Sequence, residues 1–359
     1  MPNNKILISG NEAIGAGAIQ AGCAFYAGYP ITPQNELTAY MARRMSEEGR
    51  QFIQAESELA AISMVYGAAA AGVRTMTSSS SPGISLKQEG ISYIAGAELP
   101  AVIVNIMRGG PGLGNIWPAQ SDYFQATRSG GHGDYHSIVL APTSIQEAYD
   151  LTRLAFQLAD KYRIPAIILG DAMLGQMMEP FQLSAVSRQL SAKYKKPWAL
   201  TGCKGRPANI AKSFYLLEGD LEKFNLKLQK KYRTIEEKEQ RYEGLFLEDA
   251  RIILVAYGTM ARFAKSAVKA LRNKGKKIGL IRPITLWPFP KNIFTPYTVR
   301  RTPYNKKLTF LVIEMSYGQM LEDVRLALNG AHPVEFLGRS RGGIPSKEEI
   351  IHKVSALAR

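Results

Sequence analysis

The sequence predicts an α/β fold built on a parallel sheet, and three patterns indicate it. Strand-length and helix-length segments alternate from residue 5 to residue 171. The run LPAVIVNIM, residues 99–107, is apolar on both faces, which is typical of a strand covered by helices on each side. Small polar residues and arginine follow several of the expected strands, at the edge where such sheets carry their functional groups.

Local signals set the expected elements. Residues 5–9 predict the first strand. Thr32 is expected to cap helix 34–46, with Pro33 in its first turn. Ser81 is expected to cap a helix that Pro82 begins and that continues to residue 96. The other expected elements, in order, are helix 11–22, a short strand within 24–33, strand 51–54, helix 57–71, strand 74–78, and a strand, helix and strand within 136–171.

A lysine-rich stretch of weak periodicity, from about residue 178 to residue 247, separates this unit from a second α/β unit. A charged helical piece is expected within it, around TIEEKEQRYEG. Residues 250–288 then predict a strand, a helix and a strand, and KLTFLVIEMS begins another strand. We therefore expect a domain at 1–185, a connection at 186–247 and a second domain at 248–359.

The composition, with 46% hydrophobic and 21% charged residues, is that of an ordinary soluble protein. The apolar run 64–73 is far too short to span a bilayer, and the first ten residues do not resemble a signal peptide. We expect a cytoplasmic enzyme or enzyme component. Cys23 and Cys203 lie far apart without a C-x-x-C motif, so neither a metal site nor an iron–sulfur cluster is expected on this chain.

The formal net charge of +15 is concentrated in the second half of the chain. Residues 1–185 hold 11 Lys and Arg against 15 Asp and Glu, whereas residues 186–359 hold 34 against 15. A basic half favours either an acidic protein partner or nucleic acid. Nucleic acid is the weaker alternative, because the basic residues lack the interleaved aromatic residues of single-strand binders. The stretch GAGAIQAG has the wrong spacing for a dinucleotide site.

Two carboxylates, Glu56 and Glu58, stand at the head of the segment ELAAISMVYGAAAAG. The helix expected there consists of small and apolar residues and leaves no charged face toward water. Removing an ionised carboxylate from water is costly unless a partner compensates its charge. At least one of the two glutamates is therefore expected to meet a functional partner.

Five motifs occur in one order: GYPITPQNE, QAESELAAI, TSSSSPGISLKQEG, VIVNIMRGGPGLG and QSDYFQATRSGGHGDY. Through them the chain resembles, over nearly its whole length, the alpha subunit of the thiamine-diphosphate-dependent 2-oxoacid:ferredoxin oxidoreductases. Within that family it is most similar to the branched-chain, 2-ketoisovalerate (3-methyl-2-oxobutanoate) enzymes. Residues 250–288 also resemble the transketolase C-terminal domain. The resemblance implies a thiamine pyrimidine-binding domain followed by a transketolase C-terminal-like α/β domain.

The resemblance implies a catalytic group of Glu58, Thr32 and Arg108. The catalytic glutamate of the family is the one followed by the small-residue helix, which places it at Glu58. Such a glutamate hydrogen-bonds N1′ of the thiamine aminopyrimidine and promotes formation of the reactive ylid. Glu56 is then an outer residue. Thr32 offers its hydroxyl to the oxoacid, and Arg108 holds the oxoacid carboxylate with its guanidinium fork.

The resemblance also implies which residues surround the cofactor and the substrate. The cofactor-binding group is completed by Pro30, Ile31, Ser79, Ser80, Ser81 and Gly83. The substrate group is expected to contain Leu113, Trp117, His132 and Asp134, with Ile116 and Tyr123 extending its apolar wall. Arg128 is the residue that could add a second cation to this wall.

The family motif that holds the diphosphate through Mg²⁺ is missing. Gly170, Asp171 and Ala172 replace its G-D-G, and no asparagine stands at the downstream spacing of the family. This chain is therefore expected to bind only the pyrimidine half of thiamine diphosphate. The diphosphate and Mg²⁺ are expected on a beta subunit, and the iron–sulfur clusters on a gamma or ferredoxin-like subunit.

The resemblance implies oxidative decarboxylation of a branched-chain 2-oxoacid to acyl-CoA and CO2, with CoA as acyl acceptor and ferredoxin as electron acceptor. A 2-oxoglutarate or pyruvate enzyme of the same family is the alternative. A non-catalytic scaffold subunit and a basic nucleic-acid-binding protein are alternatives of other classes. The apolar wall favours the branched-chain acid, because a distal carboxylate buried there would lack a cation.

Overall fold

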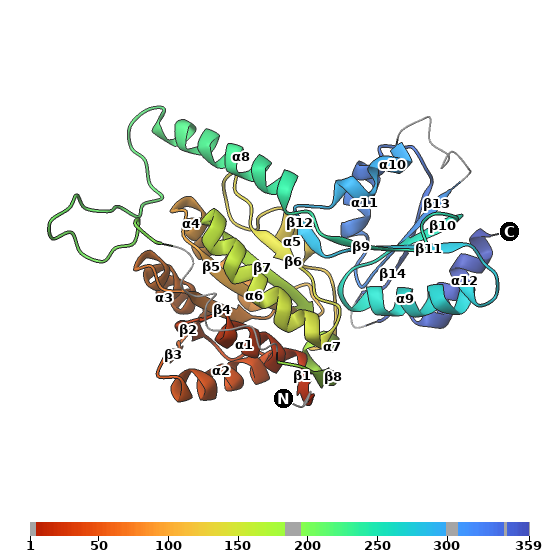
Figure 1. Cartoon of the computed structure of the whole chain (residues 1–359), viewed down its shortest axis with the longest axis horizontal. Helices are drawn as coiled ribbons and strands as arrows, with labels where there is room; N and C mark the ends of the chain where they lie inside the picture. Colours follow the sequence, from red (N-terminus) through yellow and green to blue (C-terminus); the bar gives the residue numbers. More distant parts are fainter. Residues whose placement is uncertain (1–4, 184–194, 299–307, 341–342, 359) are drawn as a thin grey trace.

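The computed structural model describes residues 5–183, 195–298, 308–340 and 343–358. Figure 1 shows two α/β units side by side, with the N-terminal unit in red to yellow-green and the C-terminal unit in cyan to blue. The first unit is built on a seven-stranded sheet and the second on a five-stranded sheet. The predicted α/β fold is thus confirmed. The expected boundary between residues 185 and 186 lies outside the described residues.

The large sheet has the strand order β12-β6-β7-β5-β4-β2-β3, and β2 to β7 run parallel. Its strands are β2 (Phe25–Gly28), β3 (Gln51–Gln54), β4 (Thr75–Ser79), β5 (Ala101–Met107), β6 (Ile138–Leu140), β7 (Pro165–Asp171) and β12 (Thr285–Trp287). Its helices are α1 (Gly10–Gln20), α2 (Asn35–Glu47), α3 (Glu58–Ala70), α4 (Ser81–Gly96), α5 (Tyr123–Thr127), α6 (Ile145–Tyr162) and α7 (Ala172–Gln176).

Helices cover this sheet on both faces (Figure 1). The chain moves one way along the sheet from β2 to β3 and back again from β3 to β4. Because crossovers between parallel strands are right-handed, this reversal places α2 and α3 on opposite faces. Helix α1 packs on α6, and α3 packs on α4.

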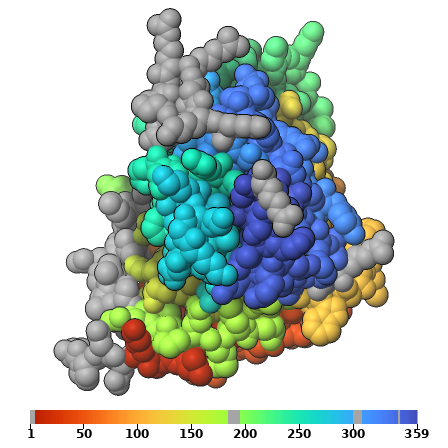
Figure 2. All heavy atoms as spheres, turned by 90° about the vertical axis from the view of Figure 1, so that its right-hand side faces the viewer, coloured from red at the N-terminus to blue at the C-terminus, as the bar shows by residue number. Residues whose placement is uncertain are grey.

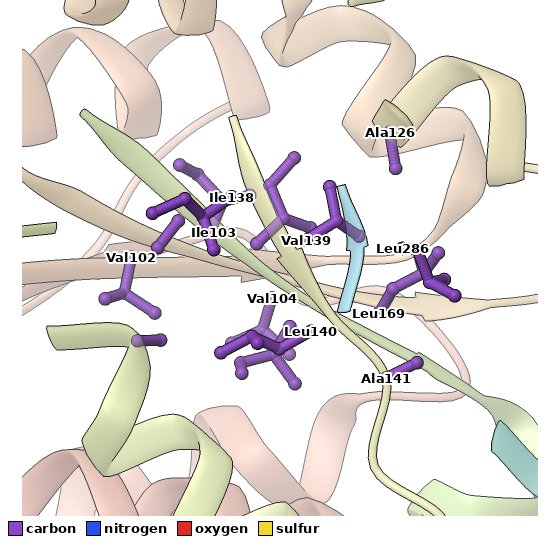
Figure 3. Close-up of a cluster of buried hydrophobic side chains, with 14 of the residues drawn as sticks. Val102, Ile103, Val104, Ala126, Ile138, Val139, Leu140, Ala141, Leu169 and Leu286 are labelled. Carbon is purple, nitrogen blue, oxygen red and sulfur yellow. The ribbon is translucent and has the colours of Figure 1, made fainter. Parts of the chain in front are cut away.

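The centre of the large sheet is entirely buried, as the apolar run 99–107 predicted. Every residue of β5 and of β7 is buried. Figure 3 shows buried side chains on both faces of the sheet at β5, β6, β7 and β12. They include Val102, Ile103, Val104, Ile138, Val139, Leu140, Leu169 and Leu286.

The second sheet has the order β14-β13-β10-β11-β9, with β9 antiparallel at one edge and the other strands parallel. Its strands are β9 (Tyr242–Leu245), β10 (Ile252–Val255), β11 (Ile278–Pro283), β13 (Thr309–Glu314) and β14 (Val334–Gly338). Its helices are α9 (Gly258–Arg272), α10 (Thr295–Thr298), α11 (Gln319–Leu328) and α12 (Lys347–Leu357), with a 3₁₀ turn at Lys291–Ile293. Figure 2 shows this unit in front, with the N-terminal unit behind it and visible along the lower edge in red to yellow-green.

Two strands do not belong to the sheet to which the predicted domain boundaries assign them. Strand β9 lies within the predicted connection yet belongs to the second sheet, while β12 lies beyond it yet extends the first sheet through β6. Of the charged helical piece expected around TIEEKEQRYEG, only TIEEK is helical, at the end of a longer helix, α8 (Asp220–Lys238), whereas YEG belongs to β9. The two sheets are therefore tied together by the chain on both sides of the connection.

A buried glutamine joins the two units. The Gln120 side chain donates to the Tyr257 carbonyl oxygen (3.0 Å) and accepts from the Met315 main-chain N–H (2.9 Å). Its main-chain N–H donates to the Met315 carbonyl oxygen (2.9 Å), and its carbonyl oxygen accepts from the Tyr257 hydroxyl (3.2 Å). We call these three residues the Gln120 contact.

The first predicted strand exists, but its expected place in the parallel sheet is wrong. β1 (Ile6–Ser9) pairs antiparallel with β8 (Met178–Phe181) in a separate two-stranded sheet. Ile6 and Leu7 are 47% and 63% exposed, so this strand is too open to lie between helical layers. Among the described residues, no helix combines the length and apolar character needed to cross a membrane.

Two predicted helix caps are also wrong. Helix α2 begins at Asn35, because residues 31–34 form a turn in which the Gln34 N–H donates to the Ile31 carbonyl oxygen. The Thr32 hydroxyl accepts from the Asn35 side chain (3.4 Å) and does not cap the main chain. Helix α4 begins at Ser81 with Ser80 as its N-cap residue, because the Ser81 hydroxyl is engaged elsewhere.

Candidate active site

Four loops meet where adjacent strands of the large sheet end. Strands β3, β2, β4 and β5 are neighbours, and because they run parallel their carboxyl ends lie at one edge. Thr32 follows β2, Glu58 follows β3, Ser80 follows β4 and Arg108 follows β5. The chain reverses its direction of travel along the sheet here, which is where parallel sheets form ligand crevices. We call Thr32, Glu58, Ser79, Ser80, Gly83 and Arg108 the strand-end site.

Glu58 is the first residue of α3, directly after the N-cap Ser57, whose hydroxyl accepts from the Ala60 N–H (3.2 Å). A carboxylate in this first turn is favoured by the helix dipole. Glu58 is only 6% exposed, and its carboxyl group hydrogen-bonds to none of the residues that the structure describes. Glu56 is exposed, as expected of an outer residue.

Gly83 on α4 provides the space that the Glu58 carboxyl group occupies. A Cβ atom built on Gly83 would lie 2.5 Å from Oε1 of Glu58 and 2.1 Å from Oγ of Ser79. The hydroxyl groups of Ser79 and Ser80 are buried and have no hydrogen-bond partner within the described chain. Buried polar groups are normally paired, so this cluster has the capacity to bind a polar ligand.

Ser81 fixes the neighbouring loops. Its hydroxyl donates to the Asp122 carboxylate (2.6 Å) and accepts from the Arg108 main-chain N–H (3.0 Å). Asn105 also donates to Asp122 (2.9 Å). Burial raises the pKa of Asp122, and these two hydrogen bonds oppose that rise. Sequence reasoning missed Asp122, although its place in the motif QSDYFQAT was a signal.

Arg108 joins the loops after β2 and β5. Its guanidinium group donates to the carbonyl oxygens of Thr32 (2.9 Å) and Leu113 (3.0 Å). Its Nε atom is buried and has no partner among the described residues. The structure therefore brings Arg108 and Thr32 together, through the main chain of Thr32.

Lys87 is a second residue that sequence reasoning missed. Its side chain is fully buried, and its ammonium group donates to the Glu58 carbonyl oxygen (3.4 Å). Burial lowers the pKa of Lys87 to about 8, and the Glu58 charge opposes this shift. The signal was its spacing, because Lys87 stands four residues after Gly83 and therefore on the same face of the helix.

The expected substrate residues separate into two groups. Leu113 and Trp117 lie on the loop that follows Arg108 and are 80% and 63% exposed. His132 and Asp134 are exposed as well, but the His132 ring lies against Tyr93, 6.4 Å between ring centres. Tyr93 is ten residues after Gly83, about 15 Å along α4. His132 therefore lies at the end of α4 opposite the strand-end site.

The remaining expected site residues lie around these groups. Pro30 is exposed and Ile31 half-buried on the loop that carries Thr32. Tyr123, expected in the substrate wall, is instead fully buried and donates to Asp323 of the second unit (2.6 Å). The Asp171 carboxylate accepts from the main-chain N–H groups at positions 173 and 174 and so caps α7.

Protein-family models match both units. Residues 16–238 match the thiamine diphosphate-binding domain of pyruvate flavodoxin/ferredoxin oxidoreductases. Residues 250–350 match core domain II of pyruvate:ferredoxin oxidoreductase. The first match contains every residue of the strand-end site.

Curated relatives match the chain over almost its whole length. The chain is 51% identical over 352 residues to ketoisovalerate oxidoreductase subunit VorB of Methanothermobacter marburgensis, covering 98% of this chain and 97% of that protein. It is 35% identical over 378 residues to 2-oxoglutarate synthase subunit KorA of the same organism, covering 98% and 99% respectively.

Solved structures share the fold. A 2-oxoglutarate:ferredoxin oxidoreductase from Magnetococcus marinus, solved with 2-oxoglutarate, coenzyme A and succinyl-CoA, matches with a TM-score of 0.84 and 26% identity. That match covers all of this chain and 66% of the other. A split-gene transketolase shares the fold at 13% identity and a TM-score of 0.59, with 97% of both chains covered. This chain therefore belongs to the 2-oxoacid:ferredoxin oxidoreductase family, as an enzyme subunit with a thiamine-diphosphate-binding domain.

Proposed function

We propose that this chain is the catalytic alpha subunit of a branched-chain 2-oxoacid:ferredoxin oxidoreductase. The reaction converts 2-ketoisovalerate and CoA to the acyl-CoA and CO2, and reduces ferredoxin. The observation that carries the proposal is the convergence of the Glu58 carboxyl group and the Ser79 hydroxyl group on Gly83, with the unpaired Ser80 hydroxyl beside them. The 51% identity to a ketoisovalerate subunit, against 35% to a 2-oxoglutarate subunit, favours the branched-chain acid.

These residues fit the pyrimidine half of thiamine diphosphate. A buried carboxyl group without a partner suits a ring nitrogen, and unpaired hydroxyl groups suit the polar edge of an aminopyrimidine. Bound thiamine diphosphate would supply the electron sink for decarboxylation. Glu58 would hold a proton at N1′, while Ser79, Ser80, Pro30 and Ile31 would orient the ring.

Arg108 and Thr32 would orient the oxoacid. A guanidinium group has five N–H donors, and two carbonyl contacts leave several of them free for a carboxylate. Because Arg108 already holds the Leu113 carbonyl oxygen, substrate binding would also fix the loop that carries Leu113 and Trp117. His132 lies at the other end of α4, and neither it nor the exposed Asp134 is part of the proposed site.

The apolar side chains near Arg108 favour a branched apolar substrate. Leu113, Ile116 and Trp117 present no cation to a distal carboxylate. Arg128, the candidate second cation, stacks on Phe124 (4.6 Å) and pairs with Asp323 of the second unit (3.0 Å). With Arg128 held by the second unit, the distal carboxylate of 2-oxoglutarate would find no cation among these side chains, which costs several kcal/mol once a bound partner or substrate removes the carboxylate from water.

Partner chains would supply the rest of the active centre. We propose a beta subunit for the diphosphate and Mg²⁺, and a gamma or ferredoxin-like subunit for the iron–sulfur clusters. Asp171, at the position of the missing diphosphate motif, is committed to capping α7. The described residues hold no group of three or more potential metal ligands.

The test uses the complex that this chain forms with its co-purifying subunits. We expect a viologen dye to be reduced fastest with 2-ketoisovalerate or its branched homologues, more slowly with pyruvate, and slowest with 2-oxoglutarate. Discrimination between near-isosteres should be modest, at ~1–3 kcal/mol per methylene. If 2-oxoglutarate gives the highest kcat/KM, the branched-chain proposal is wrong while the proposed thiamine site stands.

A further inference from the structure

Helices α3 and α4 pack through one stripe of residues that begins at Glu58. Gly83, Lys87 and Gly90 follow one face of α4, at the spacing that brings side chains together on a helix. A Cβ atom on Gly83 would meet Oε1 of Glu58 at 2.5 Å, and one on Gly90 would meet Cγ2 of Ile62 at 2.5 Å. Lys87 lies between these two contacts, so its ammonium group is enclosed beside Glu58.

This position is unfavourable for an ammonium group. Lys87 is fully buried and makes one long hydrogen bond, to the Glu58 carbonyl oxygen (3.4 Å). No carboxylate of the described residues lies within ion-pair distance of it. The N-terminus of α3 carries a partial positive charge that also opposes a cation. A methionine would fill similar space without these costs, so packing alone does not account for the lysine.

Glu58 is the charged group that acts on Lys87 in the described structure. Other charged groups near this stripe have their own partners. On α4, Glu89 accepts from the Tyr93 hydroxyl (2.6 Å). Arg108 donates to the carbonyl oxygens at positions 32 and 113. Strand β4 has no charged residue. Among these charged groups, Glu58 is therefore the one that interacts with the Lys87 charge.

We propose that Lys87 is a positioning residue of the thiamine site. Its ammonium group holds the Glu58 main chain, and its buried positive charge limits how strongly the Glu58 carboxyl group retains the proton that it shares with the cofactor. This inference rests on the proposed function of Glu58. Because burial brings the pKa of Lys87 to about 8, the ammonium form still predominates at neutral pH.

The inference predicts a change in protonation, not only in stability. A nearby positive charge disfavours the protonated form of its neighbours, so removing it should let Glu58 and the bound pyrimidine hold their shared proton to higher pH. Lys87→Met should therefore raise the pH midpoint at which the bound aminopyrimidine ring titrates, by about one unit or more.

The experiment is a pH titration of the assembled complex with bound thiamine diphosphate. Near-ultraviolet circular dichroism of the bound cofactor reports the protonation state of its aminopyrimidine ring. The variants are Lys87→Met and Lys87→Gln, so that the result does not depend on one substitution assembling. Lys231→Met is the matched control, because Lys231 is also largely buried with a lowered pKa but pairs with Glu98 (2.6 Å). Glu98 follows the far end of α4.

We expect an upward shift of the midpoint in the Lys87 variants and none in Lys231→Met. A midpoint that stays at the wild-type value in the Lys87 variants, while Glu58→Gln changes the titration, would overturn the role of Lys87 and leave the proposed function standing. A titration that neither the Lys87 variants nor Glu58→Gln alters would instead remove Glu58 from the cofactor, and with it both proposals. A shift of equal size in Lys231→Met would also count against Lys87.

Discussion

The strand-end site, apart from the exposed Thr32, and the Gln120 contact are both buried and polar, but they differ in how many of their polar groups are paired. At the Gln120 contact, both ends of the side chain and both main-chain groups of Gln120 have hydrogen-bond partners. At the strand-end site, the hydroxyl groups of Ser79 and Ser80 and Nε of Arg108 have none among the described residues.

The difference indicates what each region does. A buried polar group without a partner costs the folded chain about 1–3 kcal/mol, and a ligand that pairs the group removes this cost. A fully paired region instead contributes stability and fixes the relative position of the elements it joins. Variants of the strand-end site should therefore lose activity at little cost in stability, and variants of the Gln120 contact should do the opposite.

The largest effect is expected for Glu58→Gln. This change keeps the size of the side chain and removes its acidic proton. The kcat should therefore fall by about 10²-fold to 10⁴-fold. The melting temperature and the composition of the complex should stay unchanged. Dye reduction with 2-ketoisovalerate, beside thermal unfolding, measures both. Glu56→Gln is the matched control and should be mild, so equal losses in the two variants would remove Glu58 from its proposed role.

Gly83→Ala should come next. The added Cβ atom would displace the Glu58 carboxyl group and the Ser79 hydroxyl, and a misplacement of about 1 Å costs about 10²-fold in rate. Alanine favours the helix, so the fold should tolerate the change. Steady-state kinetics of the complex tests this.

Gly67→Ala on α3 is the control for Gly83→Ala, because nothing lies within 4 Å of the position of its added Cβ atom. It should keep full activity and gain up to ~1 kcal/mol of stability. Full activity in Gly83→Ala would show that the contact with Glu58 does not matter for catalysis.

Gln120→Ala should reverse the pattern. It would leave the Met315 N–H and the Tyr257 carbonyl oxygen buried without their partner, at ~2–4 kcal/mol in the free energy of unfolding. The kcat of the folded complex should change little. Urea unfolding of the complex measures the loss, with the exposed Gln51→Ala as the near-neutral control. A stable Gln120→Ala variant with a collapsed kcat would contradict the distinction between the two regions.

The smallest effect is a pH dependence of stability that arises from Lys87. Its pKa is about 8 in the folded chain and 10.5 as its ordinary value. Between these two values the unfolded chain binds one more proton than the folded chain, so stability should rise as the pH increases through this window. The rise is on the order of 3 kcal/mol.

Unfolding measurements across the same window, with wild type and Lys87→Met, test this dependence. The variant should be the more stable protein below about pH 8 and should lose the rise that comes from this lysine. The prediction fails if the free energy of unfolding of the wild type stays flat or falls through this pH window and Lys87→Met gives the same curve. The buried ammonium group would then carry no folding cost.

Residues close together in the sequence made much of the fold predictable. The apolar run 99–107 is a fully buried strand, and the small-residue segment after Glu58 is a helix, because both depend on local periodicity. The predictions that failed concern partners from elsewhere in the chain. β1 pairs with β8 at the far end of the first unit, and Ser81 binds Asp122 and so does not cap α4.

The sequence by itself determined the fold class and the family motifs, since these depend on residue type and local spacing, and the resemblance to the family selected Glu58 from two candidate carboxylates. Only the tertiary structure decided which groups meet that carboxylate. Gly83 lies against it and Lys87 contacts the Glu58 main chain because α4 packs on α3, and Arg108 donates to the carbonyl oxygen of Thr32. The contacts of Glu58 with Gly83 and Lys87 and of Arg108 with Thr32 join positions 25, 29 and 76 residues apart, and a local sequence pattern does not predict which distant positions the fold brings together.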